Sequence, residues 1–479
     1  MPPIGCDKDT LMDPAGTDAR SASSLRRALA VVVIAAVLVQ LAYLGLAIHA
    51  TGRVDGFALR SVDGREFMRL ARGLAWHGRF SQDEAPPFWP DTWRVPGYPL
   101  LLAGGARLFG DGTLGPIVVQ QVLAVISVGL LMVIASRWAS PRVAGAVGVL
   151  WLLDPYRGYY SLWILSGTWF VLLLLLAVWV WQRWWMGRRG GGLAFVLGAL
   201  VGLLVLTRPI GVVLVPLALL GVAAARGGGK RRAARLAACL VGVSIMLGPW
   251  VVRNKLVGGR FALSHQGGTV LAYFKAVEVV LWAERRTGHR HDDEVVHAVW
   301  ERFDQRLRTR WSIRHGPLTP QARQDIAWPQ IAWGRVRALN PLLLDREIMG
   351  LGLDVLAEHP EAAVSCWAWR CVSILTFPLS LAVAPPETTS ALPFANILPD
   401  VSVSMRRVFA GLLAAPFVVL TVVAFWRAVG LLRARRFVLV ATCALPLLAF
   451  LVATSPQLDP RFRVPMVPFL LLLATARRE

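Results

Sequence analysis

Apolar runs of membrane length recur along most of the chain. The first, residues 28–48, reads ALAVVVIAAVLVQLAYLGLAI, and later runs are separated by short polar turns. About 20 apolar residues in a helix cross the roughly 30 Å hydrocarbon layer of a bilayer. We predict crossings at the following segments: 28–48, 115–136, 143–153, 159–182, 192–206, 209–225, 235–252, 406–426, 437–453 and 463–476. The pattern predicts an all-α polytopic membrane protein of about 10–11 crossings.

Basic residues gather in the turns between these runs, and they predict the orientation. Clusters occur at 26–27, 137–142, 183–189, 226–235 and 433–436, which fall on one side of the membrane when the crossings alternate. Lys and Arg near helix ends favour the cytoplasmic side. The helix expected at 362–383 has Arg370 in its middle, so we predict that it is only partly inserted. We therefore expect both termini inside, in the cytoplasmic (inner) membrane of a cell.

This alternation divides the chain into four parts. We predict a cytoplasmic tail at 1–27, a transmembrane core at 28–252 with a first external loop at 50–97, an external segment at 253–363, and C-terminal transmembrane helices at 364–479. The external loops are expected to contain amphipathic helices.

Composition agrees with the membrane assignment. The chain has 479 residues, of which 56% are hydrophobic and 17% charged, whereas soluble domains have about 25% charged residues. The net charge of +22 is concentrated in the turns, so we expect no nucleic-acid partner. The five cysteines are scattered, with no spacing typical of a zinc or redox site.

The first external loop contains the strongest candidates for catalytic residues. Phe67, Leu70, Ala71 and Leu74 recur at helical spacing, which predicts an amphipathic helix lying at the lipid interface. Asp63 stands at the start of this helix, with Glu66 three residues later. That spacing is equally typical of a capping box, a purely structural feature.

A series of motifs then follows in a recognisable order. They are Asp63-x-x-x-Phe67-x-x-x-Ala71, Arg94-Val-Pro-Gly-Tyr98-Pro, Leu-Phe-Gly at 108–110, Leu-Asp154-Pro, Ser166-Gly167-Thr168, Leu-Thr-Arg208-Pro, Pro-Trp-Val-Val-Arg253-Asn and Asp459-Pro-Arg461-Phe-Arg463-Val-Pro. Their order resembles the GT-C glycosyltransferases, especially bacterial relatives of the protein O-mannosyltransferases and the lipid A aminoarabinose transferase. Gly167 is a departure, because that family usually has glutamate there.

The resemblance implies transfer of a sugar from a polyprenyl-phosphate donor to a hydroxyl of an envelope glycan, glycolipid or protein. The transfer would occur at the outer face of the membrane, with inversion at the anomeric carbon. A carboxylate must accept the proton of the attacking hydroxyl, and the resemblance makes Asp63 the candidate base. The lipid bilayer supplies the donor from the side.

The leaving phosphate needs cations, and arginine meets phosphate oxygens with two parallel hydrogen bonds. Arginines expected at external helix ends are Arg94, Arg208, Arg253, Arg461 and Arg463, and each could instead contact lipid headgroups. Tyr98 joins this predicted substrate-binding set through its motif.

Asp154 is a second acid at a predicted helix end. It either forms a turn with Pro155 or, as the resemblance suggests, holds a divalent cation or the acceptor. No cofactor is certain. The acidic and histidine-rich stretch 289–297 matches no compact metal pattern, and we expect a solvated helix start there.

The sequence is also compatible with two other functions. A transporter or flippase of a lipid-linked anion would use the same arginines without needing Asp63. A catalytically inactive GT-C relative would bind the donor without turnover, and the missing acid at Gly167 favours that alternative.

Overall fold

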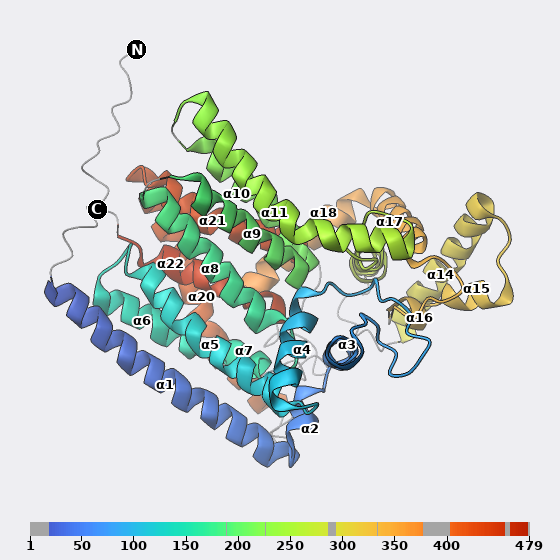
Figure 1. Ribbon diagram of the computed structural model, residues 1–479, viewed down its shortest axis with the longest axis horizontal. Coiled ribbons are helices and arrows are strands. Elements are labelled where there is room, and N and C mark those ends of the chain that lie inside the picture. Colours follow the sequence, from blue (N-terminus) through green and yellow to red (C-terminus); the bar gives the residue numbers. More distant parts are fainter. Residues whose placement is uncertain are drawn as a thin grey trace.

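The computed structural model describes residues 19–187, 189–225, 227–285, 294–332, 334–376, 403–455 and 460–477. Within these ranges all regular structure is helical, which confirms an all-α protein (Figure 1). The first half contains α1 (Ala19–Thr51), α2 (Val54–Ala58), α3 (Val62–His77), α4 (Gly97–Phe109), α5 (Leu114–Ala135), α6 (Pro141–Leu152), α7 (Pro155–Ser161), α8 (Gly167–Met186), α9 (Gly191–Thr207), the 3-10 turn η2 (Pro209–Val213), α10 (Leu214–Ala224) and α11 (Gly229–Gly258).

The second half begins with shorter helices. These are α12 (Gly267–Thr269), the π-helical turn η3 (Val270–Ala276), α13 (Val277–Ala283), α14 (Glu294–His315), α15 (Pro320–Asp325), α16 (Trp328–Ala332), α17 (Pro341–Glu358) and α18 (Pro360–Thr376). The chain ends with α20 (Val403–Arg433), α21 (Phe437–Thr454), the 3-10 turn η5 (Pro460–Phe462) and α22 (Val467–Thr475).

Six of the described helices are long and apolar enough to cross a membrane, and they confirm a polytopic membrane protein. They lie within α1, α5, α8, α11, α20 and α21. Three more predicted crossings are shorter apolar helices, at Pro141–Leu152, Gly191–Thr207 and Pro209–Ala224. The helix α18 is not among these candidates, and Arg370 within it forms an ion pair with Glu278 at 2.6 Å.

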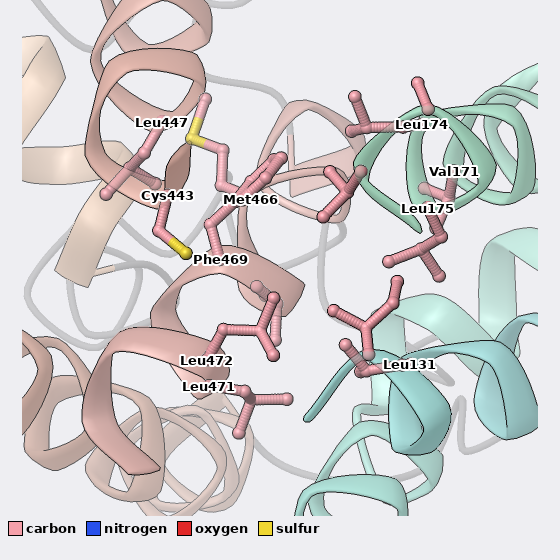
Figure 2. Close-up of a cluster of buried hydrophobic side chains, with 14 of the residues drawn as sticks. Leu131, Val171, Leu174, Leu175, Cys443, Leu447, Met466, Phe469, Leu471 and Leu472 are labelled. Carbon is pink, nitrogen blue, oxygen red and sulfur yellow. The ribbon is translucent and has the colours of Figure 1, made fainter. Parts of the chain in front are cut away.

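Two predicted crossings differ from the structure. The segment 159–182 is broken, because α7 ends at Ser161 and α8 begins only at Gly167. The segment 463–476 contains α22, whose 9 residues extend about 14 Å, too short to cross alone. Instead α22 fills the middle of the bundle. Figure 2 shows its Phe469, Leu471 and Leu472 between side chains of α21 on one side and of α5 and α8 on the other.

The bundle has one end rich in arginine and lysine, which we call the basic end. There Gln182 of α8 donates to the carbonyl of Ile134 at the end of α5, and the backbone nitrogen of Arg477 donates to the carbonyl of Trp138. Leu431, Val440 and Ala476 form a small buried cluster beside Trp138. The turns near 137–142, 183 and 433–436 therefore meet at this end, and these are three of the basic turns predicted from the sequence.

The helices α14, α15, α16 and α17 lie away from the basic end, beyond the opposite end of the bundle (Figure 1). They form, with η3 and α13, a unit with its own core, which we call the external unit. The rings of Trp300 and Trp328 stack at 4.1 Å between centroids inside it. Trp311 is also buried there, so these tryptophans form a protein core. Trp333, and residues 289–293 of the histidine-rich stretch 289–297, lie outside the described residues.

The structure corrects the expected position of the amphipathic helix. Phe67, Leu70 and Ala71 of α3 are buried, and they pack against α4 around Tyr98 and Leu102. The apolar face of α3 therefore lies on protein and not on lipid. A helix with one apolar stripe can bury that stripe against protein or against lipid, and the spacing of apolar residues in the sequence is the same in both cases.

Small residues allow α9 and α11 to approach closely. A Cβ atom on Gly198 would lie 2.0 Å from the carbonyl oxygen of Cys239, and one on Gly242 would lie 2.3 Å from that of Phe195. Helices in membranes associate through such close van der Waals contacts. The pair α9 and α11 thus depends on glycine at these positions.

We predict that Gly198→Ala lowers the thermal unfolding temperature of the detergent-solubilised protein, because overpacking a close contact costs about 1–3 kcal/mol. Gly248→Ala on α11 is the matched control, since its Cβ would meet nothing within 4 Å. Helix propensity alone favours alanine in both variants. Equal unfolding temperatures for the two variants would contradict the close packing.

Candidate active site

The side chain of Ser61 caps helix α3. Its Oγ accepts a hydrogen bond from the backbone nitrogen of Gly64 at 2.9 Å. Asp63 therefore lies inside the first turn and does not serve as the cap, so the capping-box interpretation of Asp63 and Glu66 is wrong. Both carboxylates instead point to arginines from distant parts of the chain.

Arg94 joins the two acids of α3. Its Nη2 lies 2.5 Å from Asp63 Oδ1, and its Nε donates to Glu66 Oε2 at 2.8 Å. The guanidinium also lies over the ring of Phe67, 4.9 Å from its centroid. The turn after Arg94 is held against α9, because a Cβ on Gly97 would lie 2.7 Å from the carbonyl oxygen of Leu206. This tight approach fixes the position of Arg94.

Arg461 occupies the other oxygen of Asp63. Its Nη1 donates to Asp63 Oδ2 at 2.8 Å across 398 residues of sequence. We call Asp63, Glu66, Arg94 and Arg461 the acid–arginine cluster. The Asp63 side chain remains 29% exposed, so a substrate can reach it.

The two carboxylates of the cluster differ in proton affinity. Burial by itself raises the pKa of Asp63, but the guanidinium groups of Arg94 and Arg461 outweigh it and hold that pKa well below its usual range. Burial raises the pKa of Glu66, and Arg94 offsets this only partly. Neighbouring acids with separated pKa values are typical of catalytic sites. Glu66 was not among the predicted site residues, although its spacing of three from Asp63 places both on one helix face.

Asp154 and Arg463 form a second, buried pair beside the first. Arg463 Nη2 lies 3.4 Å from Asp154 Oδ2, with side-chain exposures of 3% and 1%. Asp154 Oδ1 accepts hydrogen bonds from the backbone nitrogens of Tyr156 and Arg157, so it also caps α7. The helix-end interpretation of Asp154 is therefore confirmed. Because Arg461 and Arg463 are two residues apart, Asp63 and Asp154 are connected to the same short segment.

Three arginines line a cavity next to the acid–arginine cluster. Arg157, Arg208 and Arg461, together with Gly167 and Thr168, line a small cavity of about 20 Å³, and we call this the arginine cavity. Arg208 Nε donates to Ser166 Oγ at 2.9 Å. Arg157 is 5% exposed, and its Nε and Nη1 have no hydrogen-bond partner among the described residues. The sequence indicated Arg208 and Arg461 but gave no reason to select Arg157.

Gly167 leaves one side of the arginine cavity without an acid. A Cβ at this position would lie 3.8 Å from Arg208 Nη2, in ordinary contact distance. A glutamate there would therefore reach the guanidinium of Arg208. The glycine keeps the cavity more positive than it would be with the acid found in the resembling family.

Two predicted substrate-binding residues have mainly internal contacts. Arg253 Nη1 donates to the backbone carbonyl of Asp91, and its guanidinium lies 4.8 Å from the ring of Trp250. The hydroxyl of Tyr98 donates to Gln120 Oε1 at 2.7 Å, and the side chain is buried. These residues hold the first loop and α4 in place. The structure does not bring them into the acid–arginine cluster.

No group of three or more His, Cys, Asp or Glu side chains that could hold a metal occurs in the described part of the chain. Asp154, the predicted metal residue, has its oxygens engaged by two backbone nitrogens and Arg463. The residues present therefore do not fit a dedicated all-protein metal centre at Asp154.

Part of the chain matches the model of a known protein family. Residues 91–256 match the family model described as dolichyl-phosphate-mannose-protein mannosyltransferase. This segment runs from the turn before Arg94 to the end of α11, and it includes Asp154 and Arg208. The match confirms the resemblance to the GT-C membrane glycosyltransferases for this part of the chain. Asp63 and Arg461 lie outside it.

Two solved structures are similar over most of the chain. ArnT from Cupriavidus metallidurans bound to undecaprenyl phosphate is 18% identical, with 92% of this chain and 77% of that chain covered and a TM-score of 0.38. The apo state of the same protein is 16% identical, with 91% and 77% covered and a TM-score of 0.36. The comparison with curated proteins gives no match.

We predict that Arg94→Ala destabilises the protein by about 3 kcal/mol or more, because it leaves Asp63 and the buried Glu66 without their shared cation. Arg72→Ala is the control, since its ion pair with Asp111 is more exposed and such pairs contribute about 0–1 kcal/mol. Thermal unfolding in one detergent measures both. A smaller effect of Arg94→Ala than of Arg72→Ala would rule out the structural role.

Proposed function

We propose that this protein transfers a sugar from a polyprenyl-phosphate donor to a hydroxyl of an acceptor in the cell envelope. The observation that supports this most strongly is the partly exposed Asp63 carboxylate, which bonds to Arg461, one of the three arginines that line the arginine cavity. The family matched by residues 91–256 is described by a dolichyl-phosphate sugar donor, which is a polyprenyl phosphate. The acceptor is a glycan, a glycolipid or a protein.

The arginine cavity suits the phosphate of the donor. Arg157, Arg208 and Arg461 offer guanidinium groups in a site largely removed from water, where hydrogen bonds to a developing phosphate charge are strong. Arg157 Nε and Nη1 are buried without a partner among the described residues, and a phosphate would reach them after the side chains around this small cavity move apart. The polyprenyl chain would remain in the bilayer between the helices.

Asp63 is suited to accept the acceptor's proton. In the proposed step the acceptor oxygen bonds to the anomeric carbon, the bond from that carbon to the phosphate oxygen breaks, and the hydroxyl proton passes to Asp63. The polyprenyl phosphate leaves with the negative charge. Attack from the side opposite the phosphate inverts the anomeric centre.

Arg461 links donor binding to the strength of this base. Without donor it bonds to Asp63, where it helps to keep the pKa of that carboxylate low and the carboxylate a weak base. Arg461 also lines the arginine cavity. A phosphate that draws Arg461 away would raise the pKa of Asp63, so a bound donor would strengthen the base.

The distribution of charge supports an active site on the extracytoplasmic face of the inner membrane. The basic end carries the arginine-rich turns, which by the positive-inside tendency lie in the cytoplasm. The helix α3, which contains Asp63 and Glu66, and the external unit are at the other end (Figure 1). A hydrophilic acceptor would therefore arrive from outside the cell.

Two alternatives use the same residues differently. A flippase of a lipid-linked anion needs the arginines but not Asp63. An inactive relative binds donor without breaking its bond, and the absence of an acid at Gly167 keeps this alternative open. The exposed Asp63 favours transfer, because neither alternative requires a reachable carboxylate.

We predict that Asp63→Asn lowers sugar transfer at least about 100-fold, because asparagine cannot accept the proton. The measurement is release of sugar from a panel of labelled polyprenyl-phosphate sugars, with acceptor extract, in membranes at matched expression. Asp111→Asn is a control, since that exposed acid bonds to Arg72 and Trp76 and not to the acid–arginine cluster. Transfer that survives in Asp63→Asn would exclude Asp63 as the base, and transport without transfer would support a flippase.

We predict that Arg461→Gln shifts the acid limb of kcat/KM to higher pH. Removing a cation that lowers the pKa of Asp63 raises that pKa, so the carboxylate becomes protonated at a higher pH. The residual activity is measured across pH, with Arg65→Gln as the control because that exposed arginine bonds to the carbonyl of Leu59. An unmoved acid limb would show that Arg461 does not control the base.

A further inference from the structure

A row of buried polar side chains lies in the apolar interior beside the arginine cavity. It consists of Gln40 of α1, Gln120 and Gln121 of α5 and Ser161 at the end of α7, and we call it the amide network. Gln121, the most exposed of the four, is only 8% exposed. Polar side chains among membrane helices are costly unless paired, and they often serve a function. The amide network is therefore a candidate for a role beyond packing.

Gln40 lies on the inner face of α1. Ala36 and Ala47 share this face and are 0% and 4% exposed, whereas Leu38 and Leu41 are 61% and 59% exposed. Gln40 is the only amide in the apolar run 28–48. The helical period thus turns the one amide of the first membrane helix toward the middle of the bundle.

Two partners hold the nitrogen of the Gln40 side chain. Nε2 donates to Gln121 Oε1 at 2.6 Å and to Ser161 Oγ at 3.2 Å. Gln120 and Gln121 in turn donate to the carbonyl of Ser161, each at 2.7 Å. Because the nitrogen and the oxygen of an amide point in different directions, these bonds fix where Gln40 Oε1 points.

The oxygen of the Gln40 side chain faces Arg157, one of the three arginines that line the arginine cavity. Arg157 Nη2 lies 3.4 Å from Gln40 Oε1 and 3.4 Å from the carbonyl oxygen of Leu152. The Nε and Nη1 atoms of Arg157 have no partner among the described residues. The contacts with Gln40 and Leu152 therefore engage one nitrogen of the guanidinium and leave the other two uncommitted.

An amide affects a neighbouring arginine differently from an acid. Arg461 faces the carboxylate of Asp63, and Arg463 faces that of Asp154. Gln40 carries no charge, so it orients the guanidinium of Arg157 without neutralising it. A guanidinium that is already oriented loses less freedom when it bonds to phosphate oxygens.

We propose that Gln40 is a positioning residue for the donor phosphate, because it orients the guanidinium of Arg157 toward the arginine cavity. This inference rests on the proposed function, since it concerns how the donor of that reaction is held. The amide network anchors Gln40, Gln40 orients Arg157, and Arg157 bonds to the phosphate once the side chains around the cavity move apart. A purely structural role, in which the amides only join α1 to α5, predicts a loss of stability without a change in phosphate recognition.

The test is binding of undecaprenyl phosphate and of undecaprenol to the purified full-length protein. The two probes share the polyprenyl chain and differ only in the phosphate, so the ratio of their dissociation constants measures the preference for phosphate. We expect Gln40→Met, which keeps the length of the side chain but removes the amide, to lower this preference about 5-fold. Partial unfolding reduces the number of binding sites and does not change the ratio.

Gln182→Met is the matched control. Gln182 is a buried amide of α8, 3% exposed, and it donates to the carbonyl of Ile134 at the basic end. Its loss should lower the unfolding temperature and keep the preference for phosphate. An equal loss of preference in both variants, no loss in Gln40→Met, or a wild type without any preference would overturn the proposal.

A double-mutant cycle shows whether Gln40 acts through Arg157. In a protein that already carries Arg157→Gln, we expect Gln40→Met to change the preference by less than about 2-fold, because the group that it orients is gone. Effects of the two substitutions that multiply would contradict the proposal.

Gln40→Glu provides a second variant if Gln40→Met does not fold. A carboxylate at this position would hold Arg157 in an ion pair that competes with the phosphate, so we expect the preference to fall at least about 5-fold. A preference equal to that of the wild type would overturn the proposal as well.

Sugar release from the donor, measured on the same preparations, separates the two proposals. A phosphate preference that depends on Gln40, without any sugar release, would contradict the proposed transfer and leave the positioning role. Sugar release with a phosphate preference that Gln40→Met does not change would contradict the positioning role and leave the transfer.

Discussion

The carboxylate of Asp63 lies between two guanidinium groups from opposite ends of the chain. Arg94 follows the first loop, while Arg461 precedes the last helix, and each bonds to one oxygen of Asp63. A carboxylate in this partly buried position is stable as an anion only with such partners. The contact therefore fixes the first loop relative to the C-terminal helices, and it places the arginine cavity next to Asp63.

The other buried charges near Asp63 also depend on partners of opposite charge. Asp154 and Arg463 are almost completely buried, and each depends on the other and on backbone donors. Glu66 depends on Arg94 in the same way. Arg157 differs, because two of its nitrogens have no partner among the residues described.

The external unit extends the site away from the membrane. Its own core of stacked tryptophans makes it a firm wall, and the contact between Arg337 and Asp83 joins it to the first loop.

The sequence alone determined the helical membrane fold, because long apolar runs have few alternatives in a bilayer that offers no partner to backbone groups. It also indicated Asp63, Arg94, Arg208 and Arg461 through motifs at the ends of helices. Two predictions from the sequence were wrong, because an apolar surface of protein and one of lipid are chemically alike. The apolar face of α3 packs on α4 and not on lipid, and the run at 463–476 contains a short buried helix.

Only the tertiary structure decided which charges meet. Nothing local distinguishes Arg461, which reaches Asp63, from Arg253, which bonds to the backbone of the first loop. Glu66 and Arg157 can be recognised as site residues only when segments far apart in sequence come together. The physical reason is that apolar periodicity acts within one helix, whereas the pairing of charges depends on distances between helices that no single segment specifies.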